Sequence, residues 1–126
     1  MKEIIHTSKS PAPIGPYSQA VKFGNMLFTS GQIALDPKSQ NLILTDIESE
    51  TKQVMENLKA VLEEAGMDFM DVVKTTIFIS DMNNFSRINN VYGEYFDSES
   101  APARETVQVA RLPKDVNVEI SMIAVK

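Results

Sequence analysis

The side chains of this chain that could do chemistry include two arginines in one segment, "SAPARETVQVARLPKD". The chain has only three arginines, and Arg104 and Arg111 both lie here. Arg104 follows Pro102, which stiffens the approach, and directly precedes residues 106–112, which have the pattern of a strand. A guanidinium can hold a carboxylate through two parallel hydrogen bonds. From its position alone, Arg104 could bind an anionic ligand in this way, but a surface arginine paired with Glu105 or another acid is the more typical case.

Three other positions are unusual for their surroundings. Glu119 interrupts the apolar run "VNVEISMIAV", so it lies either on a solvated sheet face or half-buried at a site where its pKa would be raised. Lys74 lies inside "VVKTTIFI", where a lysine whose ammonium reaches solvent is more typical than a lysine of a functional site. Ser30 and Gly31 follow a predicted strand, where a glycine either admits a ligand to the backbone or simply turns the chain.

Composition excludes several kinds of chemistry. The chain has no cysteine, which removes thiolate nucleophiles, thiolate metal sites and disulfides. Its only histidine, His6, follows Ile4 and Ile5 near the N-terminus and is more typical of a strand edge than of catalysis. We expect no metal site and no cofactor. A net charge of −5 without a basic run weighs against nucleic-acid binding. No membrane span or signal peptide is apparent, so we expect a cytoplasmic protein.

The first half of the chain predicts a short opening strand, a proline-rich loop, a hairpin and a helix. Gly24-Asn25 is the expected two-residue hairpin turn. Thr45 and Glu48 have capping-box spacing, and Gly66 is expected to end the helix. Its apolar stripe is Val54, Leu58, Val61, Leu62 and Ala65.

The second half predicts a strand within "DVVKTTIFIS", a second helix and two closing strands. The helix is expected to begin near Asn83 or Asn84 and to carry Phe85, Ile88, Tyr92 and Tyr95 on one face. The strands are expected over Glu105–Leu112 and Val116–Val125, joined through residues 113–115. The order is β-β-β-α-β-α-β-β, in one domain over residues 1–126.

The last strand indicates that both faces of the sheet are apolar. Val118, Ile120, Met122 and Ala124 share one face, whereas Ile123 and Val125 share the other with Glu119 and Ser121. Two helices cover only one face of such a sheet. The other face therefore needs a partner, and self-association is the simplest one.

Five blocks of the sequence together resemble one family. The blocks are "IGPYSQAV", "GNMLFTSGQIALDP", "NLKAVLEEAG", "DVVKTTIFISDMNNFSRINNVYGEYF" and "PARETVQVARLPKDVNVEISMIAV". In this order they resemble the RidA (YjgF) family of small enamine/imine deaminases, almost from end to end. The resemblance implies a chorismate-mutase-like α+β fold, with two helices packed on one face of a mixed six-stranded sheet. It also implies a homotrimer with clefts between subunits.

The resemblance carries over to the site residue by residue. It implies a ligand-binding Arg104 and a water-handling Glu119, with Tyr17 as the aromatic of the Gly-Pro-Tyr block. The remaining substrate-binding positions that it implies are Ser30, Gly31, Lys74, Asn89 and Thr106. Thr106 stands where many members have cysteine: if that position contributes mainly backbone groups, nothing is lost, and if the thiol has a regulatory use, this chain lacks it. The loop of residues 96–102 also looks short for the family, which could alter how the pocket is covered.

The implied reaction is hydrolysis of a 2-imino acid, or its enamine, to a 2-keto acid and ammonia. Such imines, 2-iminobutanoate and 2-iminopropanoate among them, leave pyridoxal-phosphate dehydratases, and the implied role is to clear them. The alternative is a non-catalytic trimer that binds small 2-keto acids. RNA binding or cleavage is weaker, because the chain is acidic and lacks interleaved aromatic and basic residues.

The spacing of Arg104 and Glu119 favours a site shared between chains. If the closing strands form a simple hairpin, Glu119 lies opposite residues 108–110, roughly 13–20 Å from Arg104. One imino acid and one water span far less. We therefore expect a subunit interface to bring the two residues together.

Overall fold

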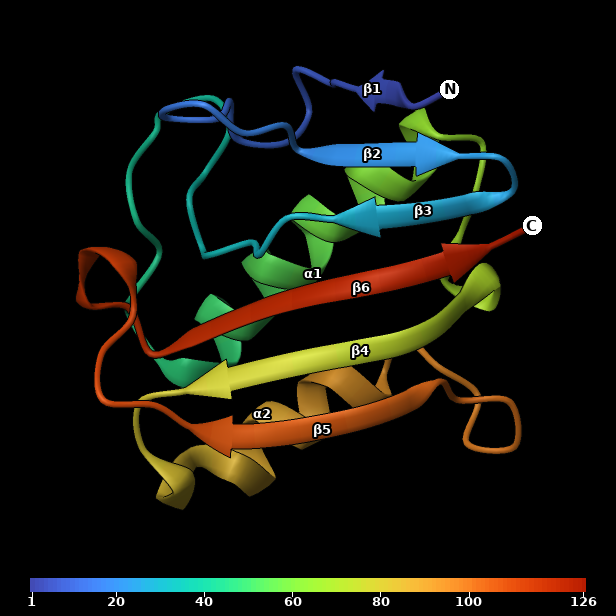
Figure 1. Ribbon diagram of the computed structural model, residues 1–126. Coiled ribbons are helices and arrows are strands. Elements are labelled where there is room, and N and C mark those ends of the chain that lie inside the picture. Colours follow the sequence, from blue (N-terminus) through green and yellow to red (C-terminus); the bar gives the residue numbers. More distant parts are fainter.

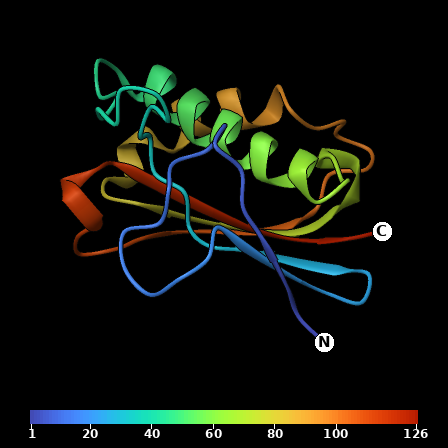
Figure 2. The same ribbon diagram turned by 90° about the horizontal axis from the view of Figure 1, so that it is seen from above.

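The computed structural model describes residues 1–126 and contains one six-stranded sheet with two α-helices (Figure 1). Figure 2 shows both helices on the same side of the sheet, and the opposite side carries no helix. No helix is long and apolar enough to cross a membrane. The predicted arrangement, two helices on one face of a mixed sheet, is confirmed. The strands are β1 (Glu3–Ile5), β2 (Ala20–Phe23), β3 (Met26–Thr29), β4 (Val72–Ile79), β5 (Ala103–Gln108) and β6 (Val118–Val125).

The sheet has the strand order β1-β2-β3-β6-β4-β5. The β2–β3 hairpin turns at Gly24, whose φ of +61° is the left-handed conformation that a two-residue hairpin turn favours, as predicted. Strand β6 lies between β3 and β4 and is antiparallel to both, whereas the edge strand β5 is parallel to β4. The closing strands β5 and β6 therefore do not form the simple hairpin considered from the sequence, because β4 lies between them.

The bounds of the closing strands also differ from the prediction. Strand β5 begins at Ala103 and ends at Gln108, opposite Ile79, because its partner β4 ends there. The chain then reaches a 3₁₀ turn, Pro113–Asp115, before β6 begins. Lys114 and Asp115 both have φ of +56°, so this connection cannot continue a strand.

Helix α1 (Ile47–Glu64) packs its predicted apolar stripe into the core, where all five residues are buried. Its N-cap is Asp46, whose carboxylate accepts a hydrogen bond from the backbone N–H of Ser49 at 2.7 Å. The predicted Thr45/Glu48 capping box is thus wrong by one position. Asp46 takes that role, and Glu48 is free to bind an arginine instead. The helix ends before Gly66, whose φ of +75° allows the expected left-handed stop.

Helix α2 (Phe85–Gly93) is shorter than predicted, because Tyr95 lies in the turn after it. Asn84 precedes the helix but makes no side-chain capping bond. A 3₁₀ turn, Met82–Asn84, comes before it and is capped by Asp81. Ile88 and Tyr92 are buried in the core, and Phe85 and Tyr95 pack against it.

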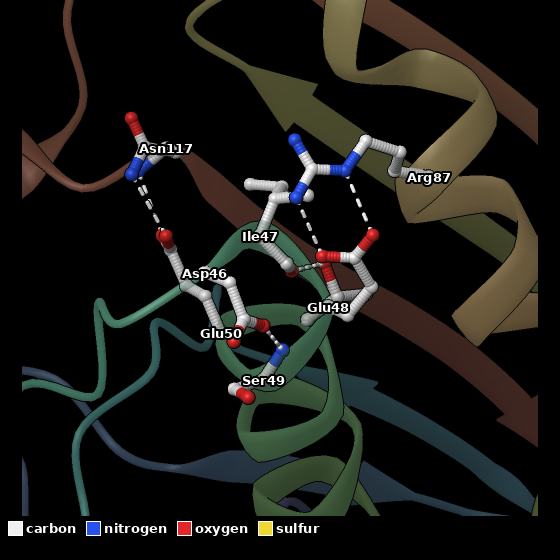
Figure 3. Close-up of polar contacts among 8 residues, drawn as sticks. Asp46, Ile47, Glu48, Ser49, Glu50, Arg87 and Asn117 are labelled. Atoms are coloured by element: carbon white, nitrogen blue, oxygen red, sulfur yellow. Dashed lines mark hydrogen bonds and ion pairs between the residues drawn. The ribbon is translucent and has the colours of Figure 1, made fainter.

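Two carboxylates in the first turn of α1 tie this helix to the rest of the molecule (Figure 3). Glu48 accepts two hydrogen bonds from the guanidinium of Arg87 on α2, both at 2.7 Å. Glu50, which is buried, accepts hydrogen bonds from the backbone N–H of Asn117 at 2.7 Å and of Val118 at 3.2 Å. The start of β6 is thereby fixed to α1 just before Glu119.

The sheet face away from the helices is open and partly apolar. Strand β6 alternates as predicted, with its four inward residues buried and Glu119, Ser121, Ile123 and Val125 partly exposed. Further large apolar side chains on this face are exposed in the single chain, namely Ile4, Phe23, Met26, Phe28 and Val107. Exposed apolar surfaces are typical of faces that bind a partner.

Candidate active site

Glu119, Tyr17, Ser30 and Gly31 line one cavity of about 440 Å³. The cavity lies where three loops meet the start of β6: the proline-rich loop, the segment after β3, and the 3₁₀ turn at residues 113–115. The rest of its lining is largely apolar and includes Ile14, Ile33 and Leu35. Four of the predicted site residues, from three distant parts of the sequence, thus come together here.

Buried amide side chains hold the loops of this cavity in place. Gln19, 1% exposed, accepts a hydrogen bond from the Thr7 N–H at 2.7 Å, and its Nε2 donates to the carbonyls of Thr7, Ser10 and Pro11. Asn57 of α1 donates to two carbonyls of the segment after β3, at 3.1 and 2.9 Å. The sequence analysis missed these residues. The Gln in the "YSQAV" block and an Asn within an apolar helix stripe were the available signals.

Glu119 is half-buried and has no hydrogen-bonding side-chain partner in the single chain. Burial raises the pKa of its carboxyl group above the ordinary value of 4.5. Its side chain lies against Gly31, where a Cβ would be 2.8 Å from the Glu119 Cδ. A carboxylate in this setting is a stronger proton acceptor near neutral pH than a solvated one.

The two hydroxyl groups of this cavity, those of Ser30 and Tyr17, form hydrogen bonds to backbone groups of the loops. Ser30 donates through its hydroxyl to the carbonyl of Ser18 at 2.5 Å. The Tyr17 hydroxyl accepts from the backbone N–H of Ile14 at 3.2 Å, so it still has its own proton to donate. Tyr17 itself is 51% exposed. Lys114 also lines the cavity and was not among the predicted residues.

Arg104 lies in a different place, at the start of the edge strand β5. Its guanidinium carbon is 5.0 Å from the ring centroid of Tyr92 and 5.7 Å from that of Phe85, both on α2. Its Nη1 donates to Asn89 Oδ1 at 2.6 Å. These contacts hold the cation by its aromatic neighbours and one amide, a type of support that favours arginine over lysine.

A second, more open cavity of about 460 Å³ includes Arg104 and Asn89. Its other lining residues are Tyr92, Gly93, Phe96, Ser98, Ala101 and Pro102. The loop of residues 96–102 therefore forms part of the wall beside Arg104. Thr106, two residues along β5 from Arg104, shares its face of the strand. The Thr106 hydroxyl oxygen is buried without a hydrogen-bond partner in the single chain.

Arg104 and Glu119 point to opposite faces of the sheet. Arg104 is opposite Thr75, which is buried under α2, whereas Glu119 is opposite Phe78 on the open face. The two partners are three positions apart on β4, which lies between β5 and β6. Their Cα atoms are therefore about 14 Å apart. A small ligand therefore cannot contact Arg104 and Glu119 of the same chain at the same time.

Lys74 lies on the open face and lines neither cavity. Its ammonium is 3.1 Å from a carboxylate oxygen of Glu105, which also accepts a hydrogen bond from Thr76. These two hydrogen bonds lower the pKa of Glu105. The structure thus separates the predicted residues into the Glu119 cavity, the Arg104 cavity and this ion pair. No group of three or more histidine or carboxylate side chains could hold a metal ion.

A family model described as Endoribonuclease L-PSP matches residues 7–126. A RutC family protein of Pyrococcus horikoshii is 56% identical over 126 residues, covering 100% of this chain and 99% of the relative. Among solved structures, TdcF of E. coli with bound serine is 46% identical with a TM-score of 0.93, covering 98% of each chain. The YjgF gene product of E. coli is 46% identical with a TM-score of 0.92, covering 98% of each chain.

A third solved structure, RidA from an Antarctic Psychrobacter, is 41% identical with a TM-score of 0.94 and covers 98% of this chain and 99% of that one. These similarities extend over nearly the whole chain, and they confirm the chorismate-mutase-like fold. The chain therefore belongs to the RidA (YjgF) family, the one to which its five sequence blocks pointed.

Proposed function

We propose that this protein is a 2-iminobutanoate/2-iminopropanoate deaminase, which hydrolyses 2-imino acids and their enamine tautomers. Water adds to the C=N carbon, and the resulting carbinolamine expels ammonia and leaves a 2-keto acid. The protonated imine carbon is already electrophilic, so the reaction needs no cofactor. The protein has to hold the carboxylate, place one water molecule and accept its proton.

Arg104 is proposed to hold the substrate carboxylate. Its Nη1 is bound to Asn89, and its other guanidinium N–H groups have no hydrogen-bonding partner in the single chain. Arg104 also has no carboxylate partner, unlike Arg87 and Arg111, which are both in ion pairs. It is the one arginine left to bind a ligand anion. The bound serine of TdcF, an amino acid with the same carboxylate, is consistent with such a ligand.

Glu119 is proposed to position the water molecule and remove its proton. The environment of this residue is the observation that carries the proposal. Its carboxylate is half-buried in a mostly apolar cavity, and burial raises its pKa. A protein that only bound 2-keto acids would have no use for a second carboxylate, which would repel the ligand. Tyr17, with its free hydroxyl proton, is proposed to assist from the same cavity.

The complete site is proposed to form between subunits of a homotrimer. Each chain carries one half of the site, with Arg104, on one face of its sheet and the other half, with Glu119, on the opposite face. The Cα atoms of these two residues are about 14 Å apart. A neighbouring chain that covers the open sheet face would bring its own edge strand β5 toward Glu119. The exposed apolar side chains of that face support such a contact.

Ser30, Gly31, Asn89, Thr106 and Lys74 are proposed to complete substrate binding. Backbone groups near Gly31 and Thr106 would meet the imine nitrogen, and Asn89 would orient the guanidinium of Arg104. Lys74 is the least supported of these, because in the single chain its ammonium is paired with Glu105. Its role would depend on how the neighbouring chain meets this ion pair.

The physiological role that we propose is removal of reactive imines released by pyridoxal-phosphate dehydratases. The direct test is ammonia release from freshly generated 2-iminobutanoate and 2-iminopropanoate, with and without the protein. We expect the protein to accelerate release above the spontaneous rate, and Glu119→Gln to abolish most of that acceleration. Tight binding of 2-ketobutyrate without acceleration would instead favour the alternative, a metabolite-binding trimer.

A further inference from the structure

Gly31 differs from Gly15, Gly24 and Gly66 in the reason why a side chain is unfavourable at its position. Gly15, Gly24 and Gly66 have positive φ, and a Cβ at any of them would meet nothing within 4 Å. Gly31 does not have a positive φ. A Cβ there would instead lie 2.8 Å from Cδ, 2.9 Å from Oε1 and 3.0 Å from Cγ of Glu119. A Cβ at Gly31 would therefore overlap the Glu119 carboxyl group, which occupies that space.

The two segments that form this contact cannot easily move apart. Residues Gln32 and Ile120 exchange two backbone hydrogen bonds, at 2.8 and 3.1 Å, directly beside Gly31 and Glu119. Asn57 holds the chain just after Gln32 by its two hydrogen bonds to backbone carbonyls. Glu50 fixes the chain just before Glu119. A clash at Gly31 would therefore be relieved by the flexible end of the Glu119 side chain.

We propose that Gly31 is a positioning residue for Glu119: its lack of a Cβ forms a slot that holds the carboxyl group in the apolar cavity. The proposal rests on the proposed function for its catalytic consequence only. An alanine at position 31 moves the carboxyl group out of the slot and toward solvent. The fold and Arg104, which lies on the other face of the sheet, are left unchanged.

The pKa of Glu119 reports on this position. Burial is the cause of its elevation, so a carboxyl group displaced toward water has a pKa closer to 4.5. The charged and titratable groups that share its surroundings are Tyr17 and Lys114 in the cavity, the Lys74–Glu105 pair on the same sheet face and, in the proposed trimer, Arg104 of a neighbouring subunit. None of these is altered by Gly31→Ala, so a lowered pKa is attributable to displacement of Glu119.

The first experiment measures the pKa of Glu119 in the wild-type protein and in Gly31→Ala, by NMR of carbon-13-labelled carboxyl groups. We expect the substitution to lower this pKa toward the ordinary value of 4.5. We also expect kcat to fall by about 10- to 100-fold, with its acid limb moved to lower pH and 2-ketobutyrate affinity kept within about threefold. An unchanged pKa for Glu119 overturns the proposal, whatever the activity.

The second experiment uses double variants as matched controls. If Gly31 acts through Glu119, Gly31→Ala lowers kcat no further in a Glu119→Gln background. Losses that multiply in the double variant would mean that Gly31 contacts the substrate directly, and the positioning role would be wrong. If Glu119→Gln alone kept full activity, the proposed base would be wrong, and the NMR measurement would still decide the position of the carboxyl group.

A third measurement covers the case in which Gly31→Ala folds poorly. In a Glu119→Ala background the obstacle is gone, so Gly31→Ala should leave the unfolding midpoint unchanged or raise it, because alanine restricts the unfolded chain. Destabilisation that is equal in both backgrounds would show that another contact fills the space at Gly31, and the slot would not exist.

Discussion

The two candidate half-sites hold their charged groups in different ways. Arg104 lies on an exposed edge strand, and its guanidinium is held by the rings of Tyr92 and Phe85 and by Asn89. Glu119 lies in a mostly apolar cavity, and its carboxyl group has no polar side-chain partner. One group is aimed by contacts, and the other is placed by the shape of the backbone around Gly31.

This difference matches what each group is proposed to do. A clamp must present its fork in one orientation, so directional contacts suit it. A base must have a raised pKa, and hydrogen bonds to its charged form would lower that pKa. Polar partners would therefore help Arg104 and impair Glu119. The two groups have different proposed roles, and their environments differ accordingly.

The largest expected effect comes from joining halves that lie on different chains. Arg104→Ala and Glu119→Ala should each be nearly inactive as pure proteins. When the two are unfolded together and refolded as an equal mixture, about a quarter of the sites in random trimers combine an intact Arg104 with an intact Glu119. Imine hydrolysis should reappear at about that fraction of the wild-type rate. If verified mixed trimers remain inactive, each site lies within one chain.

Glu119→Gln should separate binding from turnover. Glutamine keeps the shape of the side chain but cannot accept a proton from water, so we expect kcat to fall by about 10²- to 10⁴-fold. The affinity for 2-ketobutyrate, measured by calorimetry, should be retained, because the clamp lies on the other half-site. Retained turnover would assign the base to Tyr17 or to none of these residues.

Arg104→Lys should be almost as damaging as Arg104→Ala. Lysine keeps the positive charge but loses the planar fork, and each lost hydrogen bond to a charged group weakens binding by about 10- to 100-fold. The loss should appear in the affinity for 2-ketobutyrate as well as in kcat/KM. A lysine variant with wild-type kcat/KM would show that charge alone is needed, and the comparison of the two half-sites would lose its basis.

The parts of the fold that follow from short-range patterns were predictable from the sequence. The stripe of α1, the Gly24 turn and the alternation of β6 each depend on neighbouring residues. The pairing of β5 was not predictable in this way. A hairpin between consecutive strands is the common solution, but β4 lies between β5 and β6, and this depends on how the whole sheet assembles.

The candidate site was predictable as a set of residues but not as an arrangement. Residue type and position singled out Arg104 and Glu119, the resemblance implied their roles, and their spacing already indicated a long separation. That they face opposite sides of the sheet depends on the registers of β5 and β6 against β4, which no local pattern showed. The fit of Glu119 against Gly31 joins residues 88 positions apart. Such a contact is visible only in three dimensions.

The smallest expected effect is a change in the pH dependence of stability, and it tests whether the half-sites meet. The folded state raises the pKa of Glu119, so it favours the protonated form. The resulting stabilisation is present below the unfolded pKa of about 4.3 and is lost as pH rises through the higher folded value. Glu119→Gln should therefore gain stability relative to wild type between acidic and neutral pH.

Other carboxylates do not disturb this difference. The pKa values of Asp36, Glu48, Glu105 and Asp115 are lowered in the folded protein, so their stabilisation is lost as pH falls, and by the same amount in both proteins. The difference between the two proteins isolates Glu119. It is measured by chemical denaturation across this pH range at one protein concentration.

Arg104 of a neighbouring subunit should reduce the effect, because a guanidinium near Glu119 favours its charged form and lowers its pKa. The same pair of proteins is therefore compared again with Arg104→Ala in both. If the half-sites come together in the assembled protein, the gain of Glu119→Gln at neutral pH should be larger once Arg104 is removed. If the gain is the same in both backgrounds, Glu119 does not sense Arg104. The two residues would then belong to separate sites, and the contrast between them would have no catalytic meaning.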